Sequence, residues 1–253
     1  MIFDSHAHYD SHQFDEDRFD LLAKMTEAGV SGIVNCGCDI PSSKMSLEFS
    51  DKYDFVYASV GFHPGCIEDY KEGDLDIIKE LSMHKKCVAI GEVGLDYHYG
   101  KEFKEEQKEL FIKQIRLANE VGKPVIVHER EAFSDCYEIL KAEKPDKGVM
   151  HCFSGNKETL PLILSLGMYI GVGGTLTFKN NVKTVEMCPL IPKDRILLET
   201  DAPYLAPVPL RGKRNYSPYI IHVAKRVGEL MNLTTEEVLK ITEENAKRFF
   251  GIN

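Results

Sequence analysis

The sequence predicts an α/β fold: a single (β/α)8 TIM-type barrel in which residues 1–253 form one domain. Three observations favour this fold: short apolar runs alternate with helical patterns eight times, no Pro/Gly/Ser-rich linker divides the chain, and no Gly-x-Gly-x-x-Gly follows a run. Such alternation is typical of parallel strands that are buried on both faces of a sheet. Eight repeats without a dinucleotide-binding motif favour a closed barrel over an open doubly wound sheet, and barrels commonly reach this length.

Each predicted strand is a short run rich in Val, Ile and other apolar residues, and the segments between the runs have helical periodicity. The predicted strands are Ile2–His8, Gly32–Cys36, Phe55–Val60, Cys87–Ile90, Val125–His128, Gly148–Met150, Met168–Gly171 and Ile196–Leu198. The predicted helices are Asp17–Ala28, Ser42–Ser50, Asp74–Leu81, Lys104–Val121, Glu131–Lys141, Lys157–Leu166, Asn181–Cys188, Pro218–Met231 and a last helix that ends at Phe250. Thr234 and Glu237 fit a capping box at the start of that last helix.

The composition is that of a globular protein long enough to bury a sizeable core. No apolar run approaches the roughly 18 residues that a membrane span requires, so we predict no membrane association. The first residues lack the basic and apolar regions of a signal peptide, and we therefore expect a cytoplasmic protein, with no obligate protein partner implied. A net charge of −9 argues against a general nucleic-acid coat protein, but it does not exclude an enzyme that holds phosphate through metal ions.

The seven cysteines do not form a disulfide framework, because their number is odd and no Cys-x-x-Cys occurs. Most of them stand in apolar surroundings, which is typical of small buried side chains. Cys36 and Cys38, separated by one glycine, lie at the end of the second predicted strand. We favour ordinary thiols over metal ligands at both positions.

Residues with metal-ligand chemistry follow the predicted strands at their carboxyl ends, where barrel active sites are built. His6 and His8 close the first strand, and residues i and i+2 of a strand point to the same face, so both imidazoles can meet one cation. Any one histidine is more simply a hydrogen-bonded structural residue, but five in this placement together indicate a site. The other residues of this group are His63, Glu92, His128, His151 and Asp201. Glu199, two residues before Asp201, is interpreted as a pairing residue and is not assigned to metal.

Six motifs carry a more specific indication. They are Asp4-Ser5-His6-Ala7-His8, Gly61-Phe62-His63-Pro64, Gly91-Glu92-Val93-Gly94-Leu95-Asp96, Val127-His128, His151-Cys152-Phe153-Ser154-Gly155 and Glu199-Thr200-Asp201-Ala202-Pro203-Tyr204-Leu205. Together, and in this order over nearly the whole chain, they resemble the TatD family of metal-dependent hydrolases. The last two motifs are the most specific, whereas His-x-His is shared with other amidohydrolase-like barrels.

The resemblance implies a (β/α)8 barrel that binds two divalent ions, drawn from Zn, Mg, Mn, Fe or Ni, and hydrolyses ester bonds with an activated water, usually as a deoxyribonuclease. His6, His8 and Asp201 would hold one ion, His128 and His151 the other, and Glu92 would bridge them. Asp201 would also orient the water and take its proton. His63 would contact the substrate or assist the leaving group, or else form a structural His-Pro turn.

A basic segment follows the last motif. From Ala202 to Gly228 the chain has no Asp or Glu, yet it contains Arg211, Lys213, Arg214, Lys225 and Arg226. Either these cations steer a phosphodiester toward the metals, or they form a solvated face whose anionic neighbours come from elsewhere in the chain. The candidates for substrate contact are Arg211, Lys213 and Arg214.

Three functions stay open at this point. DNA phosphodiester hydrolysis is preferred. Hydrolysis of another ester or amide is the second hypothesis, because some TatD-like proteins resemble enzymes that remove D-amino acids from mischarged tRNA and because an activated water also attacks the carbonyl carbon of a small amide. The third is a barrel that binds metal or a partner without turnover, and the six intact candidate ligand positions argue against it.

Overall fold

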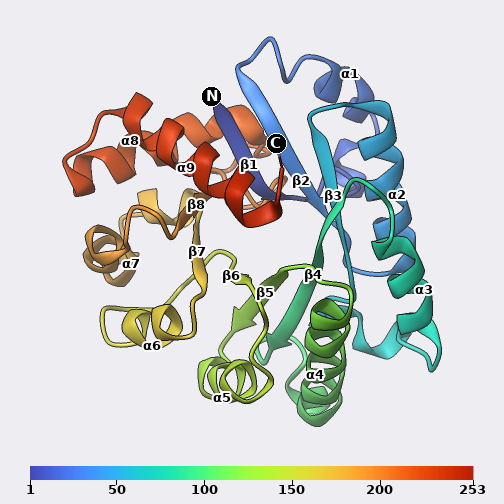
Figure 1. The fold of residues 1–253 in the computed structure, drawn as a ribbon. Helices are drawn as coiled ribbons and strands as arrows, with labels where there is room; N and C mark the ends of the chain where they lie inside the picture. The colour runs from blue at the N-terminus through green and yellow to red at the C-terminus, as the bar shows by residue number, and fades with distance from the viewer. Residues whose placement is uncertain (253) are drawn as a thin grey trace.

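The computed structural model describes residues 1–252, in which eight parallel strands form one sheet in the order β1 to β8 (Figure 1). Each strand pairs in parallel with the next one along the chain, with register shifts in the β1–β2, β3–β4 and β4–β5 pairs. The strands are β1 (Ile2–Ala7), β2 (Val30–Cys36), β3 (Val56–Val60), β4 (Cys87–Asp96), β5 (Val125–Arg130), β6 (Gly148–Met150), β7 (Tyr169–Val172) and β8 (Ile196–Leu198). The predicted barrel and all eight predicted strands are confirmed, with shifts of one or two residues at their ends, except that β4 ends six residues after the predicted Ile90.

Helices follow the strands and surround the sheet (Figure 1). The α-helices are α1 (Arg18–Ala23), α2 (Ile40–Lys52), α3 (Asp74–Ser82), α4 (Lys104–Glu120), α5 (Phe133–Glu143), α6 (Leu160–Ser165), α7 (Val182–Met187), α8 (Ile220–Met231) and α9 (Thr235–Phe250). Short 3-10 helices are η1 (His12–Phe14), η2 (Pro64–Asp69), η3 (Lys101–Phe103), η4 (Gly174–Thr177), η5 (Cys188–Leu190) and η6 (Ser217–Tyr219). Every predicted helix has a counterpart.

Helix ends differ from the prediction where local capping decides them. The α2 helix begins at Ile40, before the predicted Ser42, because the Asp39 carboxylate accepts a hydrogen bond of 2.8 Å from the Ser42 amide and closes a capping box. The α1 helix stops at Ala23, five residues early, in a series of turns that ends at Gly29 with a φ of +83°. The capping box predicted at Thr234 and Glu237 is confirmed.

The barrel closes between β1 and the segment that follows β8. The Asp201 amide donates to the His6 carbonyl at 3.0 Å, and the His8 amide donates to the Ala202 carbonyl at 2.7 Å. The buried Asp4 carboxylate reinforces this seam, because it accepts hydrogen bonds from the Thr200 and Ser217 hydroxyls at 2.6 and 2.7 Å. This closure brings the first and the last motif of the sequence to the same end of the barrel.

The interior of the barrel is filled at its amino-terminal end. One buried cluster joins side chains from strands that stand far apart around the barrel, such as Phe3 of β1 and Ile126 of β5, with Phe249 and Phe250 of α9. Side chains alternate along each strand, so the residue two positions after an inward-facing one points inward too. His128, two residues after Ile126, is therefore carried into the barrel beyond this apolar plug.

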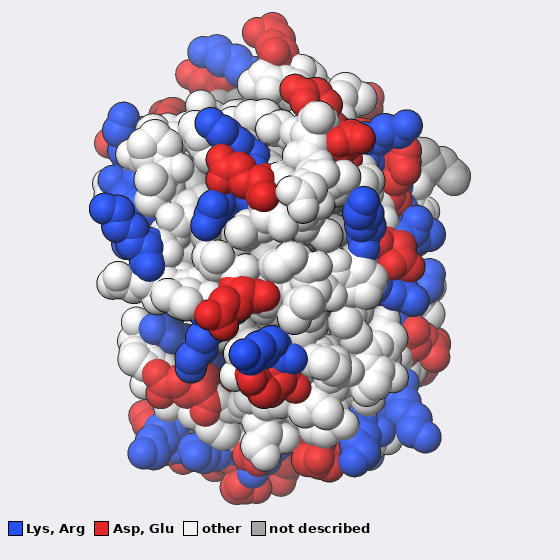
Figure 2. All heavy atoms as spheres, turned by 90° about the vertical axis from the view of Figure 1, so that its left-hand side faces the viewer, with Lys and Arg blue, Asp and Glu red and all other residues white. Residues whose placement is uncertain are grey.

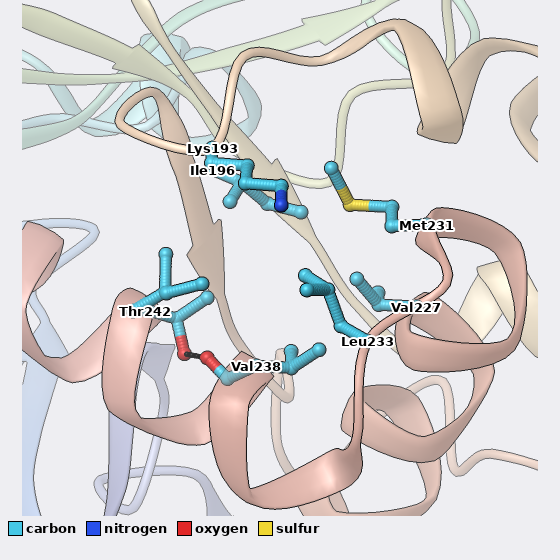
Figure 3. Close-up of a pocket in the computed structure, with 8 residues that line it drawn as sticks. Lys193, Ile196, Val227, Met231, Leu233, Val238 and Thr242 are labelled. Carbon is cyan, nitrogen blue, oxygen red and sulfur yellow. Dashed lines mark hydrogen bonds between the residues drawn. The ribbon is translucent and has the colours of Figure 1, made fainter.

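A small apolar cavity of about 10 Å³ lies outside the barrel wall, between β8, α8 and α9 (Figure 3). It is lined mainly by Ile196, Val227, Leu233 and Val238, and it has room for about one water molecule. Its lining offers no cluster of candidate metal ligands, so it is a packing defect and not the site.

Among residues 1–252, no helix combines the length and apolar character needed to cross a bilayer.

Candidate metal centre

The candidate centre is built around the carboxylate of Glu92, which β4 places inside the barrel and which is 3% exposed. Its Oε2 atom lies 3.2 Å from His6 Nε2 and 3.3 Å from His8 Nε2. Its Oε1 atom lies 2.8 Å from His128 Nδ1 and 2.9 Å from His151 Nε2. The two oxygens of one carboxylate thus face two separate pairs of imidazoles.

Asp201 joins the first of these pairs. Its Oδ1 atom lies 3.5 Å from His8 Nε2 and 3.7 Å from His6 Nε2. Directly after β8 the backbone at Asp201 has a φ of +56°, a left-handed conformation that is uncommon for a residue other than glycine. All six side chains predicted as metal ligands are therefore brought together, although they come from β1, β4, β5 and the segments after β6 and β8.

A second layer of polar groups orients the imidazoles. His8 Nδ1 donates to the Cys36 carbonyl at 3.0 Å, because that oxygen can only accept. The proton is then on Nδ1, and the lone pair of Nε2 is free to bind a cation. His128 Nε2 lies 3.2 Å from Asp96 Oδ2, and His151 Nδ1 lies 3.4 Å from Glu199 Oε1.

Asp96 was not singled out from the sequence. The reason is that β4 extends to Asp96, whereas the predicted strand ends at Ile90. Gly91 and Gly94 interrupt the apolar run, and glycines after such a run usually indicate that the strand has ended. Two-residue alternation from Glu92 would have placed Asp96 on the same face.

Glu199, predicted as a pairing residue, is fully buried, faces His151 and accepts a hydrogen bond from the Cys152 amide at 2.6 Å.

The electrostatics of the cluster favour an ionised Glu92. Burial opposes the charge of this carboxyl, but the neighbouring imidazoles, His151 foremost, together with the hydrogen bond from His128, outweigh it and hold the pKa of Glu92 well below its ordinary value. Among residues 1–252, no Lys or Arg forms a salt bridge with Glu92 or Asp201. A buried anion with imidazoles on both sides is a donor set suited to divalent cations, since buried charges are paired or coordinate metals.

His63 lies at the edge of the cluster, with Nε2 3.6 Å from Glu92 Oε1 and its ring 4.4 Å from the His128 ring. Its Nδ1 accepts a hydrogen bond of 2.9 Å from the Gly65 amide, which starts η2. Burial lowers the pKa of His63 to about 3, so the ring is neutral near pH 7. Because Nδ1 accepts, Nε2 carries the proton and can donate a hydrogen bond.

The three cations considered for substrate contact have different surroundings. Arg214 Nη1 pairs with Asp17 Oδ1 at 2.9 Å and donates to the Gln13 carbonyl at 2.7 Å, and its guanidinium lies 4.6 Å from the Phe14 ring. Arg211 is exposed and stacks 3.7 Å above the Phe178 ring, which joins the loops after β8 and β7. Lys213 is exposed. In the part of the chain that the structure describes, none of the three bonds to the six clustered side chains.

Barrel and cluster together define a metal-dependent hydrolase. The family model of the TatD related DNases matches residues 3–251, and the chain belongs to this family. The chain is 46% identical to the uncharacterized metal-dependent hydrolase YabD of Bacillus subtilis and 32% identical to the 3'-5' ssDNA/RNA exonuclease TatD of Escherichia fergusonii; both matches cover each chain completely. The crystal structure of YJJV, a TatD homologue from Escherichia coli K12, superposes with a TM-score of 0.94 at 29% identity, over 100% of this chain and 98% of that one.

Proposed function

We propose that the protein hydrolyses phosphodiester bonds of single-stranded DNA with two divalent metal ions. The observation that carries the proposal is Glu92, whose two oxygens face two separate histidine pairs. His6, His8 and Asp201 would hold one ion and His128 and His151 the other, with Glu92 shared between them. The donor set of imidazoles and carboxylates is compatible with Zn, Mn, Fe, Ni or Mg.

When bound, the two ions polarise a phosphoryl oxygen, lower the pKa of an attacking water and stabilise the departing oxygen. Asp201 is half-buried and stands on the side of His6 and His8, where it can orient that water and accept its proton. His63 stands on the side of His128 and offers an Nε2 proton. That proton would be donated to a substrate oxygen or to the leaving group, and the same proton makes His63 Nε2 unsuited to bind metal.

Two observations support a nucleic acid as the substrate: the name of one relative and the basic segment after β8. The 32% identical relative is named as an exonuclease for single-stranded DNA and RNA. Arg211, packed on Phe178 between two loops at the carboxyl ends of β7 and β8, and exposed Lys213 would contact the phosphates. We further propose that residues 1–253 act as one hydrolase domain. A cytoplasmic location stays a prediction from the sequence.

The test is a substrate panel for purified protein loaded in turn with Mn²⁺, Mg²⁺ and Zn²⁺. The panel contains end-labelled single-stranded DNA, D-aminoacyl-tRNA and small cyclic amides. We expect metal-dependent release of nucleotides from DNA, abolished in Glu92→Ala and kept in Glu27→Gln, which changes an exposed glutamate in the turn before β2. Turnover of the aminoacyl ester or an amide with no cleavage of DNA would replace the proposal by the second hypothesis.

A further inference from the structure

A thiol stands beside the candidate centre. Cys38, two residues past the end of β2, is half-buried, and its Sγ atom lies 3.8 Å from His8 Nδ1. The sulfur, one ring nitrogen of His8 and one carboxylate oxygen of Glu92 all lie within 4.8 Å of one another. This triad shares both His8 and Glu92 with the centre described above.

The backbone holds Cys38 in this position from both sides. Its amide donates to the Ser42 hydroxyl at 2.8 Å, at the start of α2. Its carbonyl accepts a hydrogen bond of 2.9 Å from the His63 amide. The thiol is therefore fixed between two segments of the site, and rotation about one side-chain bond is its main freedom.

Cys36 provides a natural comparison within the same segment. Its Sγ atom is fully buried and lies 3.4 Å from His6 Nδ1. Within residues 1–252, no carboxylate completes a donor triad around Cys36. Two neighbouring thiols thus contact the two histidines of the first pair, but only Cys38 shares a possible cation position with Glu92.

We propose that Cys38 is an additional ligand for a cation held between His8 and Glu92, and that it makes this position prefer thiophilic ions. The inference rests on the proposed metal centre and adds a donor to it. Thiolates select Zn and other soft ions, whereas carboxylates and water suit Mg and Mn. Binding forms a metal–sulfur bond, breaks the S–H bond and releases the proton to solvent.

The test uses the full chain, stripped of metal and titrated with Co²⁺ alone. A sulfur ligand gives a sulfur-to-cobalt charge-transfer band in the near ultraviolet, whereas imidazole and carboxylate ligands give only the weaker visible bands. We expect the charge-transfer band in the parent and in Cys36→Ser, and its loss in Cys38→Ser with the visible bands kept. Visible bands without a charge-transfer band in the parent, or a charge-transfer band that survives in Cys38→Ser, would overturn the proposal while the metal centre stands.

A competition measurement gives a second readout without turnover. Zn²⁺ and Mn²⁺ affinities of the parent and of both variants are measured by calorimetry on metal-free protein, with circular dichroism to verify the fold. Cys38→Ser should weaken Zn²⁺ by about tenfold or more and leave Mn²⁺ nearly unchanged. Equal losses for both ions would contradict a role of the sulfur in selection, and absence of binding by the parent would overturn the metal centre itself.

Discussion

Asp96 shows how one residue outside the candidate ligand set affects the centre. Its carboxylate contacts His128 Nε2 at 3.2 Å and also accepts hydrogen bonds from the His98 and Tyr99 amides at 2.9 and 3.0 Å. Burial opposes the charge of Asp96, but these bonds lower its pKa to about 2. An ionised, fixed acceptor behind an imidazole holds the ring in one orientation.

We expect Asp96→Asn to weaken the binding of the second metal ion by about 10-fold to 100-fold, since removing such an outer partner typically costs this much. Calorimetric titration of Zn²⁺ into metal-free protein measures it. Asp146→Asn, on the surface between α5 and β6, is the control and should leave both affinities unchanged. Equal affinities for Asp96→Asn and the parent would show that His128 needs no support from Asp96.

Arg214 fits the second reading of the basic segment, in which a cation has its anionic neighbour elsewhere in the chain, but the sequence did not predict which residue that neighbour is. Asp17, its partner, stands almost 200 positions earlier, and no local pattern connects the two. The hydrogen bonds from Arg214 lower the pKa of Asp17. The pair therefore stabilises the fold fully above the ordinary pKa of Asp, about 3.9, and loses this effect as the pH falls further.

Arg214→Ala should lower the free energy of unfolding at pH 7 by about 1 kcal/mol or less, because the Arg214 and Asp17 side chains are 33% and 43% exposed and solvent screens such pairs. The difference from the parent should shrink below about pH 4, with a remainder from lost packing on Phe14. Urea unfolding from pH 7 down to pH 3.5 measures this. A difference that does not change with pH would mean that the ion pair contributes nothing.

At the scale of elements, the strands and the convergence of the candidate ligands could be predicted from the sequence. Apolar runs mark the strands, parallel strands end at one face of a barrel, and two-residue alternation places His6 with His8. The supporting contacts could not be predicted in the same way. They depend on where strands truly end, as β4 does at Asp96, and on partners that the closed barrel brings together, such as Asp4 with Thr200.

The α9 helix has a role separate from the site. Phe249 is 1% exposed and packs against the rings of Tyr169 and Phe250, each at 4.8 Å, at the apolar end of the barrel. Phe249→Ala should therefore cost about 3 to 5 kcal/mol of stability. The number of metal ions bound per molecule of Phe249→Ala, measured well below the melting temperature, should equal that of the parent.

The control for this change is Leu190→Ala, because Leu190 is 55% exposed. It should shift the unfolding free energy by no more than about 0.5 kcal/mol. Chemical denaturation of both variants measures the comparison. A loss of metal from folded Phe249→Ala would mean that the plug and the candidate centre are not independent.

At the scale of the whole molecule, charge is distributed without a dominant basic surface on the side that Figure 2 shows, where acidic and basic side chains are interspersed. The chain carries a net charge of −9, which repels a polyanion. Binding of DNA should therefore depend more on the bound metal ions than on basic side chains at the protein surface.

We expect metal-free protein to bind single-stranded DNA with a Kd no tighter than about 10⁻⁴ M, the weak end of non-specific binding. Addition of Ca²⁺ or Mn²⁺ should tighten it at least about tenfold, because the cations would neutralise the phosphate at the centre. Fluorescence anisotropy of a labelled oligonucleotide measures both states. Tight, strongly salt-dependent binding without metal would instead indicate a basic surface as the main DNA contact.

We expect Glu92 to bridge two cations, each held by its own histidines. The most direct measurement is a crystal structure of the protein grown with Mn²⁺ or Zn²⁺, with anomalous diffraction data at the metal edge. We expect two anomalous peaks about 3.5 to 4 Å apart, one beside His6, His8 and Asp201 and the other beside His128 and His151, with one Glu92 oxygen bound to each. A single peak, or peaks away from Glu92, would contradict this expectation.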